Sequence, residues 1–275
     1  MRARNPESKT GILRAAIMKL IEQHRADGTI PTSGRFLFYE LEMQGDVSKD
    51  NGKVKGDDKL VSEALTDLRK MGEIEWDEIK DESRELTQWN SAPTIKDYMR
   101  SSVRWAKIDP WDGNPPMVIC ESRTVSGALY ETAGEYLAPI TATVGQCGGF
   151  LHSDIGPALK DGQQILYYGD LDVQGNDIEM NTKKVLEEII GGELEWERLA
   201  LTMAQANRFG LKRFMKLDNR TGIKSGAIEA ESLSQLRLVN ILRDRLNALL
   251  PEPLSVIHAR EETQREAVLR LLGRK

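Results

Sequence analysis

The sequence predicts an α/β protein in which a mostly helical N-terminal domain precedes a parallel-sheet domain that ends in helices. Residues 8–71 carry helical patterns of apolar residues. Residues 117–201 alternate short apolar runs with helical spacing, which indicates a parallel sheet covered by helices. A segment dense in proline and glycine, residues 109–116, separates the two regions. We therefore expect two domains, residues 1–108 and 117–275.

The N-terminal domain is predicted to hold three helices and a strand. Thr32 or Ser33 is a suitable N-cap for the second helix. Three helices followed by a short strand are typical of a winged helix-turn-helix, whose third helix would contact DNA, here through Lys59 and Arg69. The predicted elements are helices over residues 8–26, 32–43 and 57–71, a strand over residues 73–76, and a further helix over residues 94–106.

The C-terminal domain is predicted from short apolar runs that alternate with amphipathic stretches. Runs of four to eight apolar residues bounded by turn residues indicate buried parallel strands. Longer stretches with apolar residues at helical spacing indicate the helices between and after them. The predicted strands cover residues 117–120, 140–144, 165–168 and 194–201, and the later helices cover residues 176–190, 231–250 and 256–272.

Carboxylates follow two of the predicted strands. Asp170 and Asp172 come just after the strand over residues 165–168, and ligands of open α/β sheets lie beyond the carboxyl ends of the strands. Two carboxylates at such a point repel each other unless a cation joins them, which favours Mg²⁺, an ion that prefers oxygen ligands. The alternative is structural, because aspartate also caps helices and forms turns. Glu121, directly after the strand over residues 117–120, supplies a third acid.

The composition is ordinary for a soluble globular protein, with 40% hydrophobic and 29% charged residues among 275. No apolar run approaches the roughly 20 residues of a membrane helix, and the polar N-terminus has no signal-peptide core. Cys120 and Cys147 have neither zinc-site nor Cys-x-x-Cys spacing, so we expect free thiols. These features predict a cytoplasmic protein without membrane contact, and nucleoid association is an expectation that depends on the DNA-binding resemblance described below.

The net charge of −5 argues mildly against a nucleic-acid partner, but the charges are unevenly distributed. The N-terminal segment is basic, and a second basic run covers residues 208–224. Each run is compatible either with DNA binding or with a solvated surface. The candidate DNA contacts in the second run are Lys212, Arg213, Lys216, Arg220 and Lys224.

A glutamate after one strand and Asp-x-Asp after a later one resembles the acidic signature of a TOPRIM domain. A winged helix followed by such a domain resembles the A subunit of topoisomerase VI and its meiotic double-strand-break relatives. Within that superfamily the chain is most similar to short stand-alone proteins of bacteria, phages and plasmids. The motifs that carry the resemblance are Arg35-Phe-Leu-Phe-Tyr39, Trp76-Asp-Glu-Ile79-Lys-Asp81-Glu-Ser-Arg84, Gly169 through Ile178, Arg198-Leu-Ala-Leu-Thr202, Gln205, Lys216-Leu-Asp218-Asn-Arg220 and Ile228-Glu-Ala230.

The resemblance implies that Tyr39 attacks a DNA phosphodiester and forms a 5′-phosphotyrosyl bond. It implies that Asp170 and Asp172 hold Mg²⁺, which Mn²⁺ could replace, and that Glu121 assists proton transfer or metal binding. Arg35 lies one helical turn before Tyr39 and could stabilise the phosphate or the phenolate. Without the resemblance, Tyr39 is interpreted as a core aromatic residue.

The resemblance also implies partners. The substrate would be double-stranded DNA, and a homodimer would combine Tyr39 of one protomer with the metal site of the other. The sequence has no Gly-x-x-x-x-Gly-Lys-Ser/Thr motif, so ATP-driven strand passage would require a separate ATPase subunit of the B type.

Two other functions fit the same residues. The first is a TOPRIM-type nuclease or nickase that hydrolyses DNA and uses Tyr39 only in packing. The second is a non-catalytic DNA-binding protein of a mobile element. A covalent protein–DNA adduct separates the transesterase from both, and free nicked DNA separates the nuclease from the scaffold.

Overall fold

Four parallel strands in the order β4-β3-β5-β6 form the central sheet. The computed structural model describes residues 8–48, 57–80, 89–145, 148–217 and 224–273. In register, Cys120 at the end of β3 lies opposite Ala142 of β4 and Tyr168 of β5, so these strands end at the same edge of the sheet. The strands are β3 (Met117–Cys120), β4 (Ile140–Ala142), β5 (Gln164–Tyr168) and β6 (Glu195–Ala200).

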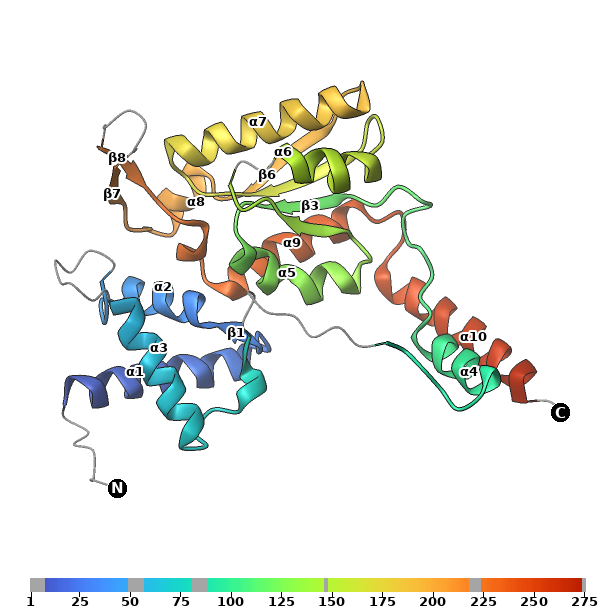
Figure 1. The fold of residues 1–275 in the computed structure, drawn as a ribbon, viewed down its shortest axis with the longest axis horizontal. Coiled ribbons are helices and arrows are strands. Elements are labelled where there is room, and N and C mark those ends of the chain that lie inside the picture. The colour runs from blue at the N-terminus through green and yellow to red at the C-terminus, as the bar shows by residue number, and fades with distance from the viewer. Residues whose placement is uncertain (1–7, 49–56, 81–88, 146–147, 218–223, 274–275) are drawn as a thin grey trace.

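Both faces of the central strands β3 and β5 are buried, because their alternate side chains enter different hydrophobic clusters. Met117 and Ile119 pack with the cluster beneath α7, whereas Val118 and Cys120 pack with the cluster beneath α5 and α9. Figure 1 shows the three layers, with α7 on one side and α5 and α9 on the other. The covering elements are α5 (Arg123–Glu135), α6 (Gly148–Phe150), the π-helix Leu151–Ile155, the 3₁₀ turn Gly156–Ala158, α7 (Val173–Ile190) and α9 (Gln235–Leu249). The structure therefore confirms an α/β protein with a parallel sheet.

The N-terminal unit, defined as residues 8–48 and 57–80, has its own hydrophobic cluster. Ser33 caps α2 by accepting from Phe36 N, as the sequence predicts. The elements are α1 (Lys9–Asp27), β1 (Thr32–Ser33), α2 (Gly34–Gln44), α3 (Asp57–Lys70), the 3₁₀ turn Trp76–Glu78 and β2 (Ile79–Lys80). β2 pairs with β1 in parallel.

The strand predicted over residues 73–76 is wrong, because the only strand after α3 within residues 57–80 is the two-residue β2. The side chains of Glu75 and Glu78 form a capping box around the 3₁₀ turn. Arg25 Nε donates to Glu78 Oε1 at 2.6 Å and holds this turn against α1. These local hydrogen bonds compete with the extended backbone that a strand would need.

Other predicted elements are confirmed with shifted ends. Helix α7 begins at Val173 rather than at residue 176, because Asp172 caps it. The strand predicted to reach residue 144 stops at Ala142, and Val144 has a positive φ of 51°. Helix α9 begins at Gln235, after the 3₁₀ turn Ala230–Ser232. Cys120 is a free, buried thiol, while Cys147 lies outside the described residues.

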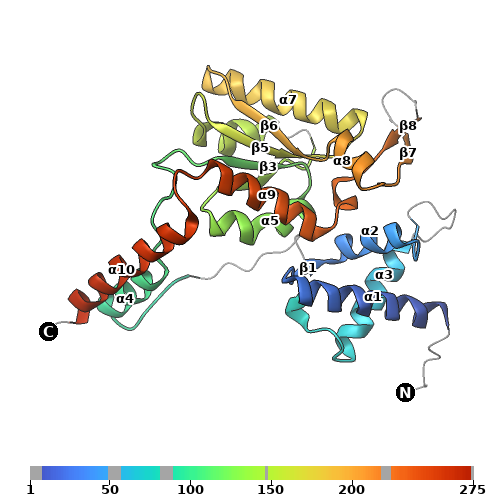
Figure 2. The same cartoon turned by 180° about the vertical axis from the view of Figure 1, so that it is seen from behind.

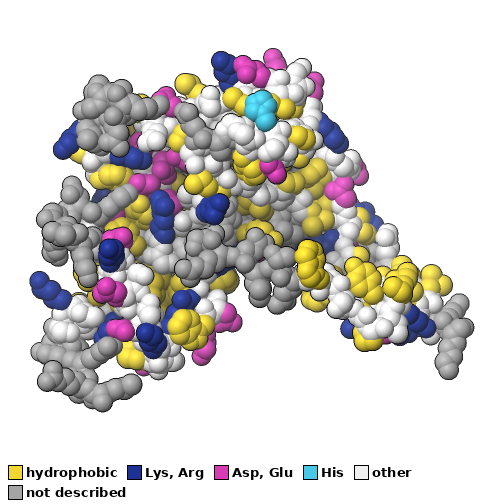
Figure 3. All heavy atoms as spheres, viewed as in Figure 1, with side chains coloured by type: hydrophobic (Ala, Val, Ile, Leu, Met, Phe, Trp, Pro, Cys, Tyr) yellow, Lys and Arg dark blue, Asp and Glu magenta, His cyan; other side chains and the backbone are white. Residues whose placement is uncertain are grey.

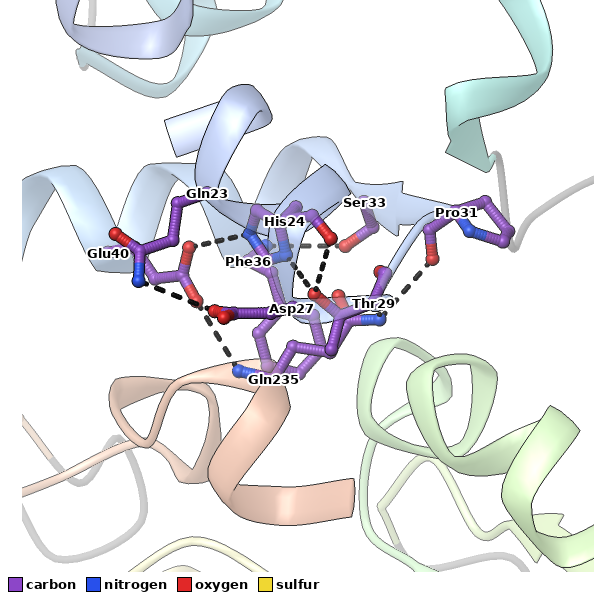
Figure 4. A network of polar contacts seen from close by, with 9 residues as sticks. All are labelled: Gln23, His24, Asp27, Thr29, Pro31, Ser33, Phe36, Glu40 and Gln235. Carbon is purple, nitrogen blue, oxygen red and sulfur yellow. Dashed lines mark hydrogen bonds and ion pairs between the residues drawn. The ribbon is translucent and has the colours of Figure 1, made fainter. Parts of the chain in front are cut away.

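A buried polar network joins the N-terminal unit to the start of α9 (Figure 4). His24 Nε2 lies 2.8 Å from Glu40 Oε2, and His24 Nδ1 lies 2.7 Å from Thr29 Oγ1. The backbone N–H of Gln235 donates to Glu40 Oε1 at 3.3 Å. The Gln235 side chain donates to the carbonyl oxygens of Thr29, at 2.9 Å, and of Pro31, at 3.3 Å. One residue of α9 thus contacts α2 and the loop between α1 and β1.

Helices α4 (Ile95–Trp105) and α10 (Leu254–Gly273) form an arm that projects from the sheet (Figures 1 and 2). The backbone N–H of Ile108 donates to Glu261 Oε1 at 2.8 Å, and Arg100 donates to Leu272 O at 3.2 Å. Helix α4, which was expected to belong to the N-terminal domain of residues 1–108, therefore packs on α10. Hydrophobic side chains gather along this arm in Figure 3, and no residue within α4 is buried.

Between the sheet and α9 the chain forms α8 (Met203–Arg208) and an antiparallel hairpin of β7 (Phe214–Leu217) and β8 (Lys224–Ala227). An isolated antiparallel bridge pairs Ile228 with Leu171, next to the end of β5. This bridge brings the segment after β8 to the edge where the sheet strands end. Among the described residues, no helix combines the length and apolar content needed to span a membrane.

Candidate metal centre

Glu121 and Asp170 meet where β3 and β5 end. Glu121 follows β3 directly, and its backbone N–H donates to Tyr168 O at 2.8 Å, which continues the pairing of the two strands. The Asp170 backbone N–H then donates to Glu121 Oε2 at 2.9 Å. The ends of the two strands predicted to carry acids therefore meet, through the backbone of Asp170 and the carboxylate of Glu121.

Two glycines make room for the Glu121 carboxylate. A Cβ on Gly169 would lie 2.6 Å from Tyr167 Cε1 and 3.1 Å from Glu121 Oε2. A Cβ on Gly175 would lie 2.7 Å from the Asp170 carbonyl oxygen and 3.1 Å from Glu121 Oε2. Contacts this short are not tolerated by a side chain, so both positions require glycine for close packing rather than for a special φ.

The bridge between Leu171 and Ile228 adds two further acids to this edge. Leu171 N donates to Ile228 O at 2.9 Å, and Ile228 N donates back at 3.2 Å. The Ala230 backbone N–H donates to Asp170 Oδ1 at 2.9 Å. Glu229 and Glu231 flank Ala230 and therefore lie beside Asp170. Within the described residues, one group of three acids has ligand oxygens within 4.8 Å of one another: Asp170, Glu229 and Glu231. We call this group the acidic triad.

Glu229 and Glu231 were not among the predicted site residues. Ile228-Glu-Ala230 is among the motifs that carry the resemblance, but it has no predicted role. No helical or strand pattern marks this segment, which forms a bridge and a 3₁₀ turn. The signals available in the sequence were this motif and the two acids separated by one residue, just after the segment that forms β8.

The acidic triad is buried and lacks full compensation of its charge. Glu231 is fully buried, and its Oε2 has no hydrogen-bond partner among the described residues. Burial, with further contributions from the charges of Glu229, Glu121 and Glu231, raises the pKa of Asp170 from 3.8 to about 9. Burial is also the main cause that raises the pKa of Glu121. Clustered buried carboxylates with an unpaired oxygen fit a hard cation, which would supply the missing positive charge.

Asp172 has two other roles. Its Oδ1 accepts from Gly175 N at 2.6 Å and caps α7, which is the structural alternative that the sequence left open. Its Oδ2 pairs with Lys216 Nζ at 2.6 Å. Burial of Lys216 is outweighed by Asp172 and nearby carboxylates, so the pKa of Lys216 is raised. Neither Asp172 nor Glu121 belongs to the acidic triad, although both border it.

Arg35 connects α2 of the N-terminal unit to the acidic triad. Its Nε lies 3.0 Å from Glu231 Oε1, and its Nη2 lies 3.5 Å from Glu229 Oε2. The Ser122 hydroxyl, at the start of α5, donates to the same Glu231 oxygen at 2.9 Å. The Arg35 guanidinium carbon also lies 5.8 Å from the centroid of the Tyr39 ring. The predicted nucleophile and the acidic triad are therefore linked within one chain through Arg35.

Tyr39 is buried, with 4% of its surface exposed, and its ring packs edge-on against Phe38. This agrees with the packing alternative stated above. Tyr39 also lines a cavity of about 750 Å³ between α2, α3 and β2. Arg35 and six further polar or charged residues line it as well: Asp57, Asp58, Ser62, Thr66, Arg69 and Lys80.

The predicted DNA contacts have different surroundings. Lys59, Lys212, Arg213 and Lys224 are exposed. Lys212 Nζ also donates to Glu42 O at 2.8 Å. Arg69 donates to the carbonyl oxygens of Trp76 and Ile79 and stacks on Trp76, while Lys216 is held at Asp172; Arg220 lies outside the described residues.

The fold and the site define an α/β protein with a buried acidic cluster at the carboxyl edge of its parallel sheet. Comparisons of the chain with protein-family models, with curated proteins and with solved structures yield no match.

Proposed function

We propose that this chain is a Mg²⁺-dependent DNA-cleaving transesterase of the winged-helix and TOPRIM type, similar to the A subunits of type IIB topoisomerases. The observation that carries the proposal is the contact of Arg35 with both Glu231 and the Tyr39 ring. It brings the helix with the candidate nucleophile to the acidic triad. The N-terminal unit, with three helices and two short strands, would be the winged helix.

The acidic triad would hold the metal, and Glu121 and Asp172 border it. A bound divalent cation would polarise the scissile phosphate and offset its developing charge. The phenol oxygen of Tyr39 would form the bond to the 5′-phosphate, and the 3′-oxygen of the adjacent nucleotide would leave as a hydroxyl. Burial raises the pKa of Glu121, so its carboxylate would be a stronger base than an exposed one and would take the phenol proton.

The metal part of the proposal is tested by binding. Mg²⁺ or Mn²⁺ should raise the melting temperature, because binding at a hundredfold excess over Kd stabilises a fold by about 2.7 kcal/mol. Asp170→Asn and Glu231→Gln should abolish this rise. Asp172→Asn should reduce it less, since Asp172 already pairs with Lys216. An equal rise in Asp170→Asn and wild type would place the metal elsewhere.

The chemical step is tested by a covalent adduct. Wild-type protein incubated with supercoiled DNA and Mn²⁺, then denatured, should carry DNA on Tyr39. Tyr39→Phe should carry none, whereas Tyr130→Phe, which removes an exposed hydroxyl on α5, should behave as wild type. The protein alone should hydrolyse no ATP, because strand passage would need a separate ATPase subunit.

The burial of Tyr39 favours a second candidate, a nuclease that activates water at the acidic triad and uses Tyr39 in packing. In that case Tyr39→Phe would still release nicked DNA without attached protein. Asp170→Asn would be inactive under either function. Whether the Tyr39→Phe variant still nicks DNA therefore decides between the nuclease and the transesterase.

The proposal includes a homodimer that cuts both strands of a duplex, one at each composite site. Mixing Tyr39→Phe protein with Asp170→Asn protein tests this arrangement. If Tyr39 serves the partner's metal site, heterodimers regain one intact site and make single-strand nicks. If both groups act within one chain, as the Arg35–Glu231 contact allows, the mixture stays inactive.

A further inference from the structure

Arg35 forms ion pairs with two members of the acidic triad. Its Nε lies 3.0 Å from Glu231 Oε1, and its Nη2 lies 3.5 Å from Glu229 Oε2. Glu231 is fully buried, and Glu229 is almost fully buried. The Arg35 side chain itself is 47% exposed. A side chain from the N-terminal unit thus partly neutralises acids from the segment after β8.

Arg35 uses oxygens of the group that would bind a metal ion. Of the two carboxylate oxygens of Glu231, Oε1 accepts from Arg35 and Ser122, whereas Oε2 has no hydrogen-bond partner among the described residues. A divalent cation held by Glu229 and Glu231 would be repelled by a guanidinium at ion-pair distance from both. In surroundings of low dielectric constant such repulsion is much stronger than in water.

We infer that Arg35 is a built-in counter-ion that competes with a divalent cation for Glu229 and Glu231, so that metal binding and docking of Arg35 oppose each other. This inference rests on the metal site of the proposed function. Linkage makes this coupling reciprocal: the factor by which docked Arg35 weakens metal binding equals the factor by which bound metal weakens the Arg35 contact. A released Arg35 stays beside the cavity that Tyr39 lines, where it can contact a phosphate.

Release of Arg35 would not detach the N-terminal unit. The network of His24, Glu40 and Gln235 holds it to α9 without using the acidic triad. Lys212 holds the end of α2 through Glu42 O. The competition is therefore a local exchange of cations at the end of α2, and it can be measured without DNA and without activity.

The first test is Mn²⁺ binding by calorimetry to wild type, Arg35→Gln and Arg35→Lys. Arg35→Gln removes the charge but retains hydrogen-bonding groups, and it should bind Mn²⁺ roughly tenfold more tightly, within the ~5–150-fold range of typical couplings. Arg35→Lys keeps the charge and should bind like wild type. Lys80→Gln, a charge removal in the same cavity, should leave the Mn²⁺ affinity unchanged. Equal or weaker binding by Arg35→Gln overturns the inference.

The second test needs no charge-removing variant. The Arg35 Nε–H resonance of wild-type protein, assigned by its loss in Arg35→Lys, should lose its ion-paired shift as Mg²⁺ is added. A resonance that stays unchanged at saturating Mg²⁺ overturns the inference while leaving the metal site intact. If neither wild type nor Arg35→Gln binds metal, the proposed metal site fails and the competition fails with it. Binding by Arg35→Gln alone supports the competition in its strongest form.

Discussion

Asp170 and Glu121 are joined by one hydrogen bond, in which the Asp170 backbone N–H donates to Glu121 Oε2 at 2.9 Å. This bond joins the chain just beyond the ends of β3 and β5, and it depends on the space that Gly169 and Gly175 leave open. The placement of the candidate site therefore depends on two residues that have no side chain.

Gly175→Ala should disturb this arrangement. Its Cβ would lie 2.7 Å from the Asp170 carbonyl oxygen, so the backbone must shift, and we expect a loss of about 1–3 kcal/mol in the free energy of unfolding. Gly134→Ala is the matched control, because it lies in helix α5 with open space around it and should be neutral or slightly stabilising. Urea unfolding of the two variants measures the difference. Equal stabilities would show that the contact at Gly175 relaxes freely.

The stability of the metal-free protein should depend on the protonation of Asp170. Its pKa is raised from 3.8 to about 9, so the folded chain keeps a proton that the unfolded chain releases between those values. Stability in the presence of a chelator should therefore fall as the pH rises from about 4 toward 9. Asp170→Asn keeps an oxygen for the Ala230 N–H but cannot ionise, so its stability should fall less steeply. Melting temperatures across this pH range measure the two slopes, and identical slopes would contradict the assignment.

Two substitutions of Asp172 should separate the contribution of helix capping to stability from that of the ion pair with Lys216. Asp172→Asn keeps an oxygen that can cap α7 but loses the ion pair with Lys216, whereas Asp172→Ala loses both. We expect Asp172→Ala to be less stable than Asp172→Asn by about 1 kcal/mol, the usual cost of a lost N-cap. Chemical denaturation gives this difference directly. If the two variants unfold alike, the cap contributes nothing to stability.

Gln235 should hold the N-terminal unit in place. Gln235→Leu leaves the carbonyl oxygens of Thr29 and Pro31 without their donor, and unsatisfied buried acceptors cost about 1–3 kcal/mol. We expect a lower free energy of unfolding and faster hydrogen exchange at the start of α9. Gln164→Leu, which removes a side chain that donates to Glu195 O on an exposed edge, serves as the comparison. A larger loss in the Gln164 variant would argue against the network.

DNA binding, as proposed, should weaken with salt through the exposed basic residues. Each phosphate contact contributes about −0.9 to the slope of log Kobs against log salt. Lys212→Ala and Lys224→Ala should each reduce the magnitude of that slope by about 1. Lys184→Ala on α7, whose lysine pairs with Glu188, should leave it unchanged. Unchanged slopes for Lys212 and Lys224 would remove the second basic run from the DNA-binding surface.

The sequence by itself determined the order of elements and part of the site. Apolar runs identify β3 and β5 because both faces of these strands are buried, and the acids after them follow from their position at the strand ends. The helices α2, α3, α4, α7 and α10 follow from helical spacing of apolar residues, and α2 also from its capping residue Ser33. These features are local, so a window of a few residues contains the signal.

Only the tertiary structure decided which acids converge and what neutralises them. Glu229 and Glu231 reach Asp170 through the bridge of Ile228 with Leu171, a pairing across more than fifty residues that no local pattern encodes. Arg35 contacts those acids because α2 packs against the turn that carries Glu231. The packing of α4 on α10, rather than on the N-terminal unit, is likewise set by the tertiary structure. Such contacts depend on how separate hydrophobic faces fit together, and the periodicity of each segment does not specify its partner.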